Sequence, residues 1–219
     1  MENNPLIIIT PTWKRPERIP YLRRFAAVLR DAAPLKWLLV EDAAHTDPEV
    51  TAFLLETGID HTYWAVGPTR DKGNPQRDSA LLHILANQLH GIIYNGDDDN
   101  HYSPALFHEL RKVRHIGLLP VGNLGPSGIE RPIVSDGRIQ YWDAGWKSRK
   151  YPVDMAGFAF HTTLLAALQP PLWNHTGVGG ESEFIDKLIT TPAQFEFLCD
   201  NCTTCHVWHN HPLQSPPPA

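Results

Sequence analysis

Short apolar runs alternate with helical patterns through the first hundred residues, and this alternation constrains the fold more than any other feature of the chain. The runs that we expect to form buried strands are residues 6–9, 36–40, 61–66 and 91–95. Helical patterns separate these runs and begin after Pro20, at Asp47-Pro48 and at Asn74-Pro75. Short strand–helix–strand connections favour a mostly parallel sheet with helices on both faces.

Each predicted helix has one apolar face, and the strand patterns after residue 100 are shorter. In the helix that begins at Asn74-Pro75, the face expected to be buried comprises Ala80, Leu81, Ile84 and Leu85. The later elements are predicted as a helix after Ser103-Pro104, strands at 118–121, 133–134 and 139–142, and a helix after Gly180. Asp136-Gly137, between the last two strands, is a hairpin signal.

Three adjacent carboxylates, Asp97, Asp98 and Asp99, follow the fourth apolar run at Gly96. Neighbouring carboxylates repel one another, so such a triplet is tolerated on a solvated turn or around a cation. Open α/β sheets bind ligands at the carboxyl ends of their strands, and hard divalent cations prefer oxygen ligands. The triplet therefore favours a site for a metal ion and a diphosphate, with a solvated acidic loop as the alternative.

Other charged residues are expected at the same edge of the sheet. Asp42 follows the second apolar run and could accept a hydrogen bond from a base or a ribose. Arg15, Lys72 and Arg77 could neutralise a diphosphate or a sugar carboxylate. A loop acid and ordinary surface charge are the alternatives for these residues.

Length and charge exclude several classes of protein. With 219 residues, the chain suits one large α/β domain. Its 19 Lys and Arg against 24 Asp and Glu give a net charge of −5, which disfavours nucleic-acid binding. The N-terminal apolar run is far shorter than the roughly 20 residues that a membrane span needs. We therefore expect a soluble, cytoplasmic protein.

Three cysteines, Cys199, Cys202 and Cys205, lie in a C-x2-C-x2-C pattern, and histidines follow closely. An odd number of cysteines argues against a simple disulfide framework. Thiolate and imidazole ligands suit structural zinc or an iron–sulfur cluster. The alternative is a cysteine-containing strand or turn with one Cys–Cys contact.

Several motifs, in order along nearly the whole chain, resemble glycosyltransferase family 43, the inverting β-1,3-glucuronosyltransferases. The stretches that carry this resemblance are Thr10-Pro11-Thr12, residues 37–43 (WLLVEDA), 76–81 (QRDSAL), 97–103 (DDDNHYS), 152–159 (PVDMAGFA) and 207–209 (VWH). The resemblance implies a GT-A fold, which is a Rossmann-like, mostly parallel α/β sheet with helices on both faces and a smaller mixed sheet on the acceptor side. It also implies a UDP-sugar donor, a sugar acceptor and Mn2+ or Mg2+, with a homodimer as one possible assembly.

The resemblance also implies roles for individual residues. The implied donor-binding residues are Pro11, Trp13, Asp42, Lys72, Arg77, Asp97, Asp98 and His209. The implied metal ligand is Asp99, and the implied acceptor-binding residues are Glu130, Trp146, Arg149 and Asp154. We expect one domain with a nucleotide-sugar-binding half at about 1–100, an acceptor-binding and catalytic half at about 101–211, and a disordered tail at 212–219.

Glu181 matches the position of the family's catalytic base. Inversion requires a base that deprotonates the acceptor hydroxyl as it attacks the anomeric carbon. A position at a helix N-terminus would favour the ionised carboxylate. An ordinary glutamate at the start of a helix is the alternative, and Glu183 is the weaker candidate because it would face away.

The chain departs from the family pattern at three positions of the donor site. Trp13 replaces a tyrosine, Lys72 replaces an arginine, and Gly177 stands where the family has a diphosphate-binding arginine. We expect transfer of glucuronic acid from UDP to a sugar hydroxyl, forming a β linkage. A UDP-xylose-dependent xylosyltransferase and a non-catalytic protein that binds nucleotide sugars or glycans remain as alternatives.

Overall fold

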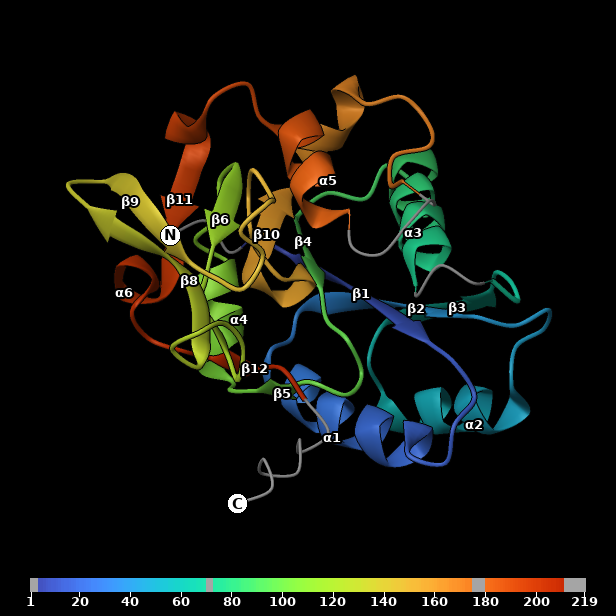
Figure 1. Ribbon diagram of the computed structural model, residues 1–219. Helices are drawn as coiled ribbons and strands as arrows, with labels where there is room; N and C mark the ends of the chain where they lie inside the picture. Colours follow the sequence, from blue (N-terminus) through green and yellow to red (C-terminus); the bar gives the residue numbers. More distant parts are fainter. Residues whose placement is uncertain (1–3, 70–72, 175–179, 211–219) are drawn as a thin grey trace, which may run out of the picture.

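A seven-stranded sheet forms the centre of the computed structural model, which describes residues 4–69, 73–174 and 180–210 (Figure 1). Its strands are β1 (Leu6–Thr12), β2 (Leu35–Glu41), β3 (His61–Ala65), β4 (Ile92–Asn95), β6 (Ile116–Leu118), β10 (Phe158–His161) and β11 (Phe195–Phe197). They are arranged in the order β11-β6-β10-β4-β1-β2-β3. Only β10 among these strands runs antiparallel to its neighbours. The predicted mostly parallel sheet is therefore confirmed.

Helices cover both faces of this sheet. On one face lie α1 (Arg18–Asp31), α2 (Pro48–Thr57), α4 (Ala105–Leu110) and α6 (Leu198–Cys202). On the other face lie α3 (Asn74–Ala86) and α5 (Glu181–Leu188). In β1, Leu6 and Ile8 pack on the first face and Ile7 and Ile9 on the second. Burial on both faces explains why β1 reads as an unbroken apolar run.

A smaller mixed sheet lies beside the central one. Its strands are β5 (His101–Tyr102), β7 (Val121–Gly122), β8 (Ile129–Ser135), β9 (Arg138–Asp143) and β12 (Val207–Trp208), in the order β5-β12-β7-β8-β9. Asp136 and Gly137 join β8 and β9 with φ angles of 51° and 69°, as a tight hairpin turn requires. The predicted hairpin is confirmed. Three short 3-10 helices complete the chain at Met155–Gly157, Thr162–Ala167 and Pro192–Gln194.

Some boundaries differ from the predictions. The single strand expected at 118–121 is wrong, because the chain leaves the central sheet after Leu118 and enters the smaller sheet at Val121. Leu85 is 37% exposed instead of buried, since it lies about 90° around α3 from the centre of the buried stripe. In the part of the chain that the structure describes, no helix is long and apolar enough to span a bilayer.

The segment labelled α6, which carries two of the cysteines, is mostly a left-handed turn and not a regular α-helix. Four consecutive residues, Cys199 to Cys202, have φ angles of 54°, 56°, 52° and 61°, which side chains other than glycine rarely adopt. Glu109 accepts a hydrogen bond from the Cys199 amide at 3.0 Å, and the Cys202 thiol donates to the Leu118 carbonyl at 3.3 Å. Burial raises the pKa of Cys199 and of Cys202 to about 12, so both remain thiols.

The structure does not support a metal at these cysteines. Among residues 4–69, 73–174 and 180–210, no three His, Cys, Asp or Glu side chains converge in a way that could hold a metal ion. All three cysteines are free thiols. The described cysteines thus lie in a turn, as the alternative predicts, without a disulfide between them.

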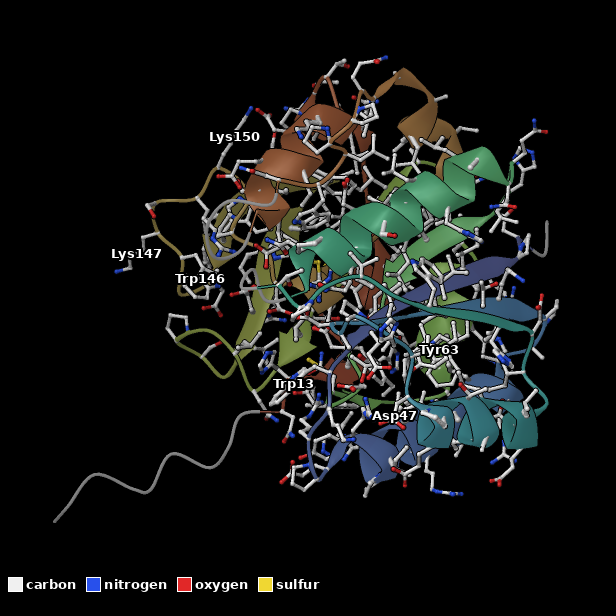
Figure 2. The ribbon with its side chains drawn as sticks, turned by 90° about the vertical axis from the view of Figure 1, so that its right-hand side faces the viewer. Trp13, Asp47, Tyr63, Trp146, Lys147 and Lys150 are labelled. Atoms are coloured by element: carbon white, nitrogen blue, oxygen red, sulfur yellow. The ribbon has the colours of Figure 1, made fainter. Side chains whose placement is uncertain are left out.

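A buried ionic network fixes the carboxyl end of β2 against α1. Arg18 is 2% exposed, and its guanidinium donates to Glu41 at 2.7 Å and to Asp47 at 2.5 Å. The Tyr63 hydroxyl donates to Glu41 and accepts from the Asp47 amide at 2.9 Å (Asp47 and Tyr63 in Figure 2). The network therefore holds both ends of the loop that contains Asp42.

We predict that Arg18→Met lowers the free energy of unfolding by about 3 kcal/mol, because the Glu41 carboxylate would stay buried without its cation. Urea unfolding followed by circular dichroism measures this loss. Lys36→Met is the matched control, since its ion pair with Asp60 is mostly exposed and should contribute less than about 1 kcal/mol. Equal stability of the two variants would contradict the assignment.

Candidate functional site

A cavity of about 480 Å3 opens at the carboxyl ends of β1, β2 and β4. These three strands are neighbours and run in the same direction, so the residues that follow them meet at one edge. The cavity is lined by Pro11, Thr12, Trp13, Arg15, Asp42, Thr69, Gly73, Gln76, Arg77, Asp97, Asp98 and Asp99. The strand alternation in the sequence thus places the acidic triplet and Asp42 in one site.

The turn that carries the triplet is held close to the sheet. The Gly96 amide donates to the Ile9 carbonyl at 2.9 Å, and the Thr10 hydroxyl donates to the Gly96 carbonyl at 2.6 Å. A β-carbon at Gly96 would lie 2.6 Å from the Phe25 ring. Glycine is therefore required where the chain leaves β4 and turns over α1.

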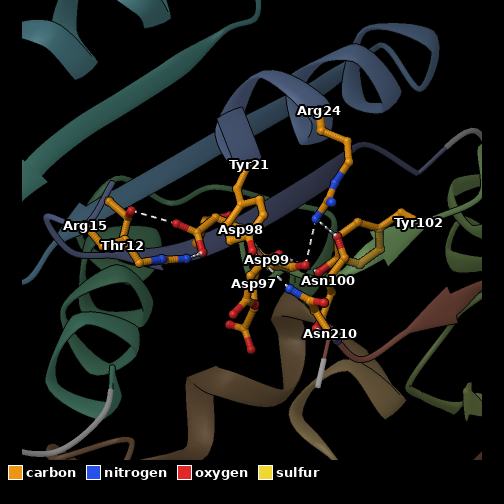
Figure 3. Close-up of polar contacts among 12 residues, drawn as sticks. Thr12, Arg15, Tyr21, Arg24, Asp97, Asp98, Asp99, Asn100, Tyr102 and Asn210 are labelled. Carbon is orange, nitrogen blue, oxygen red and sulfur yellow. Dashed lines mark hydrogen bonds and ion pairs between the residues drawn. The ribbon is translucent and has the colours of Figure 1, made fainter. Parts of the chain in front are cut away.

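The three carboxylates have different surroundings (Figure 3). Asp97 forms an ion pair with Arg77 at 2.6 Å. Asp98 is 3% exposed and accepts from the Arg15 guanidinium and, at 2.8 Å, from the Thr12 hydroxyl. Burial nevertheless raises the pKa of Asp98 to about 6. Burial also raises the pKa of Asp99, and the negative charge of Asp97 adds to this rise.

Trp13 and Asp42 lie at the rim of the cavity. The Trp13 ring is 55% exposed, and the Arg15 guanidinium lies 5.2 Å from its centroid. Asp42 accepts hydrogen bonds from the Thr69 amide at 2.7 Å and from the Thr69 hydroxyl at 3.1 Å. An exposed aromatic face next to a fixed carboxylate can bind a planar, hydrogen-bonding ring.

Glu181 is the first residue of α5 and is 7% exposed. Burial raises its pKa, against the effects of its own backbone amide and of Arg149. The Arg149 guanidinium lies 3.0 Å from the Glu181 carboxylate and 4.3 Å from the centroid of the Trp146 ring. Trp146 is 47% exposed on a loop that projects from the molecule (Figure 2). The predicted base and two predicted acceptor residues are thus in direct contact.

Glu130 and Asp154 form an acidic pair, in which Glu130 is buried and Asp154 is partly buried. Glu130 is 3% exposed in β8 and accepts a hydrogen bond from the Asp154 amide. Among the described residues, Oε1 of Glu130 has no hydrogen-bond partner. Burial, with the charge of Asp154, raises the pKa of Glu130 to about 7. Burial also raises the pKa of Asp154, whose carboxylate accepts from the Ala156 amide at 2.9 Å.

His209 influences the pKa values of acids in both groups. Its amide donates to the Gly122 carbonyl at 3.0 Å, which fixes it at the end of β12. Its charge opposes the rise in pKa of both Asp99 and Asp154. His209 therefore lies within electrostatic reach of the donor cavity and of the acceptor-side acids.

The structure brings most of the predicted donor residues together. Those that line the cavity are Pro11, Trp13, Asp42, Arg77, Asp97 and Asp98, together with the predicted metal ligand Asp99, whereas His209 does not line it. Lys72 and Gly177 lie outside the described residues. The sequence did not single out Thr12, Thr69, Gly73 or Gln76. Thr12 and Gln76 lie inside motifs quoted above, whereas nothing in the sequence marks Thr69 and Gly73. The binding roles themselves stay predictions.

We predict that Glu130→Gln removes a pH dependence of stability. Because folding raises the pKa of Glu130 from 4.5 to about 7, the folded state binds its proton more tightly than the unfolded state. This contribution is fully present below pH 4.5 and is lost as the pH rises through 7. At pH 8 the variant should therefore be more stable than the wild type by about 3 kcal/mol, relative to their difference at pH 4.

Urea unfolding of both proteins between pH 4 and pH 8 measures this difference. Asp98 is present in both proteins, so its own pH dependence cancels in the comparison. Parallel stability curves for the two proteins would show that Glu130 titrates near its ordinary value.

The sequence matches a known family over most of its length. A model of glycosyltransferase family 43 matches residues 25–212. The human protein named galactosylgalactosylxylosylprotein 3-beta-glucuronosyltransferase 2 is 36% identical over 217 residues, which cover 92% of this chain and 67% of that protein. A rice protein (Oryza sativa subsp. japonica) named "Probable beta-1,4-xylosyltransferase IRX9L" is 33% identical over 96% of this chain and 52% of its own length. The chain thus spans about two thirds of the first relative and about half of the second.

Solved structures share the fold at low sequence identity. The crystal structure of S. aureus TarS 1–349 is 12% identical, with a TM-score of 0.60 over 93% of this chain and 60% of that chain. The same protein in complex with UDP-GlcNAc is 13% identical, with a TM-score of 0.59 over 94% of this chain and 58% of that chain. The predicted GT-A fold is confirmed.

Proposed function

The chain belongs to glycosyltransferase family 43, and we propose that it transfers a sugar from a UDP-sugar to a sugar hydroxyl, with inversion at the anomeric carbon and formation of a β linkage. The observation that carries this proposal is the arrangement of carboxylates around the cavity. The triplet of Asp97, Asp98 and Asp99 lines it at the end of β4. Glu181 is close enough to Arg77, which lines this cavity, for the arginine's charge to lower the pKa of Glu181.

We propose glucuronic acid as the transferred sugar. The human relative is named a glucuronosyltransferase, and Arg77 is suited to a sugar carboxylate. Arg77 already forms an ion pair with Asp97, so its charge is shared between that partner and any donor. UDP-xylose is the alternative donor, which the name of the rice relative favours.

In the proposed reaction, Glu181 accepts the proton of the acceptor hydroxyl while the hydroxyl oxygen forms a bond to the anomeric carbon of the donor sugar. The bond between that carbon and the UDP oxygen breaks on the opposite side, and its electrons leave with UDP. A carboxylate whose pKa is raised by burial is a stronger base than an exposed one. Arg149 orients Glu181 and favours its ionised form, and Trp146 offers an exposed ring against which a sugar can stack.

The residues present fit a divalent cation at Asp99. Its carboxylate lines the cavity, and like charge from Asp97 raises its pKa, so a cation would relieve this repulsion. Mg2+ and Mn2+ are commonly bound through one or two carboxylates, with substrate phosphates and water as the other ligands. When bound, Mn2+ or Mg2+ would neutralise charge on the leaving diphosphate.

Release of UDP with Mn2+ across a panel of UDP-sugars, with and without β-galactoside and xyloside acceptors, tests the proposed function. We expect release that is selective for UDP-glucuronic acid and is lost when a chelator removes the metal. Release selective for UDP-xylose would assign the alternative donor. Tight UDP binding without release from any donor would instead favour the non-catalytic binding protein that the glycine at position 177 suggests.

We predict that Glu181→Gln lowers kcat at least about 100-fold and leaves UDP affinity unchanged, because the variant removes the base without disturbing the donor cavity. Calorimetry with UDP and turnover with the preferred donor measure the two effects. Glu183→Gln is the matched control, since this residue lies in the same helical turn but is exposed. Full activity of Glu181→Gln would exclude Glu181 as the base.

A further inference from the structure

Arg24 of α1 holds the main chain of the acidic triplet (Figure 3). Its Nη2 atom donates to the carbonyl oxygens of Asp99 at 2.7 Å and of Asn100 at 3.1 Å. Its guanidinium lies 4.9 Å from the centroid of the Tyr21 ring, and its Nη1 atom lies 3.3 Å from Nε2 of His101. One side chain therefore fixes two consecutive peptide groups at the point where Asp99 enters the cavity.

Arg24 acts from outside the cavity. It is not among the described residues that line the site, so it is placed to influence a ligand through the main chain. A guanidinium suits this role because it is planar, permanently charged and able to donate several hydrogen bonds in fixed directions.

A second contact ties this segment to the end of β12. The Asn100 side chain is 1% exposed, and its carbonyl oxygen accepts from the amide of Asn210 at 3.2 Å. The Asn210 side chain donates to the Tyr21 hydroxyl at 3.3 Å, and Tyr21 lies under Arg24. These contacts form a closed ring from α1 through the acidic turn to Asn210 and back. Asp99 and His209, which precedes Asn210, are therefore positioned by the same framework.

We propose that Arg24 is a positioning residue for the cation: by holding the carbonyls of Asp99 and Asn100, it directs the Asp99 carboxylate into the cavity and sets the affinity of the site for Mn2+. This inference rests on the proposed function, in which Asp99 is the cation ligand. Arg24 itself contacts neither the cation nor the nucleotide sugar.

Four variants separate this role from general stability. Arg24→Met keeps the aliphatic stem and removes every donor, whereas Arg24→Lys keeps the charge and can restore part of the hydrogen bonding. Arg23→Met is the matched control, because Arg23 is the residue before Arg24 in α1 but is exposed. Its ion pair with Glu56 is long, at 3.8 Å, and lies on the surface. Asp99→Asn is the reference for loss of the ligand itself.

Calorimetric titration of each protein with Mn2+ in the presence of saturating UDP measures cation affinity, and titration with uridine without metal measures the nucleoside pocket. We expect Arg24→Met to weaken Mn2+ binding by about tenfold or more, as for other residues that orient a ligand. Uridine affinity should stay within about twofold of the wild type, since Arg24 does not line the cavity and the residues that line it are unchanged. Arg24→Lys should recover part of the cation affinity, and Arg23→Met should equal the wild type.

Unchanged Mn2+ affinity in Arg24→Met would overturn the inference, and so would a parallel loss of uridine and Mn2+ binding, which would indicate general disruption of the site. Absence of Mn2+ binding by the wild type in the presence of UDP would overturn the cation site of the proposed function, and the inference with it. The wild-type titration thus separates failure of the proposed function from failure of the role of Arg24.

Discussion

Repulsion between carboxylates at one edge of a parallel sheet is the constraint on which the rest of the site depends. Parallel β1, β2 and β4 bring the acids that follow them to one cavity. Arg77 neutralises Asp97, and Arg15 neutralises Asp98. Among the ion pairs of the described residues, none includes Asp99. Within the triplet, Asp99 is thus the carboxylate whose charge a bound cation can balance.

Besides Arg77, three arginines that support this edge come from the segment before residue 25. Arg15 binds the side chain of Asp98, Arg18 joins Glu41 to Asp47, and Arg24 holds main-chain carbonyls of the acidic turn. Each arginine contacts a different part of the site, and all three precede the region that the family model matches. This edge of the sheet therefore depends on the start of α1 and the loop before it as much as on the motifs that identify the family.

The sequence predicts those strands and turns that have a clear hydrophobic pattern or a recognisable turn motif. Buried strands such as β1 and β2 are long enough to show an apolar run, and Asp136-Gly137 marks its hairpin. By contrast, β10 and β11 have four and three residues, which is too short to show a hydrophobic pattern typical of strands. The left-handed turn at the cysteines was not predictable, because tertiary contacts from Glu109 and Leu118 stabilise it. The supporting contacts of Arg18 and Arg24 likewise join residues far apart in the sequence.

Charge distribution on the acceptor side favours Glu181 as the base over its neighbours. Glu130 is deeply buried and forms no ion pair with another described residue. Its pKa of about 7 keeps it largely protonated below neutral pH. A protonated Glu130 adds no negative charge against which Glu181 must ionise. Glu181 has an arginine at 3.0 Å and lies at the N-terminus of α5, both of which favour its carboxylate. In the proposed reaction, a Glu130 that is already protonated cannot accept a second proton, whereas an ionised Glu181 can accept one.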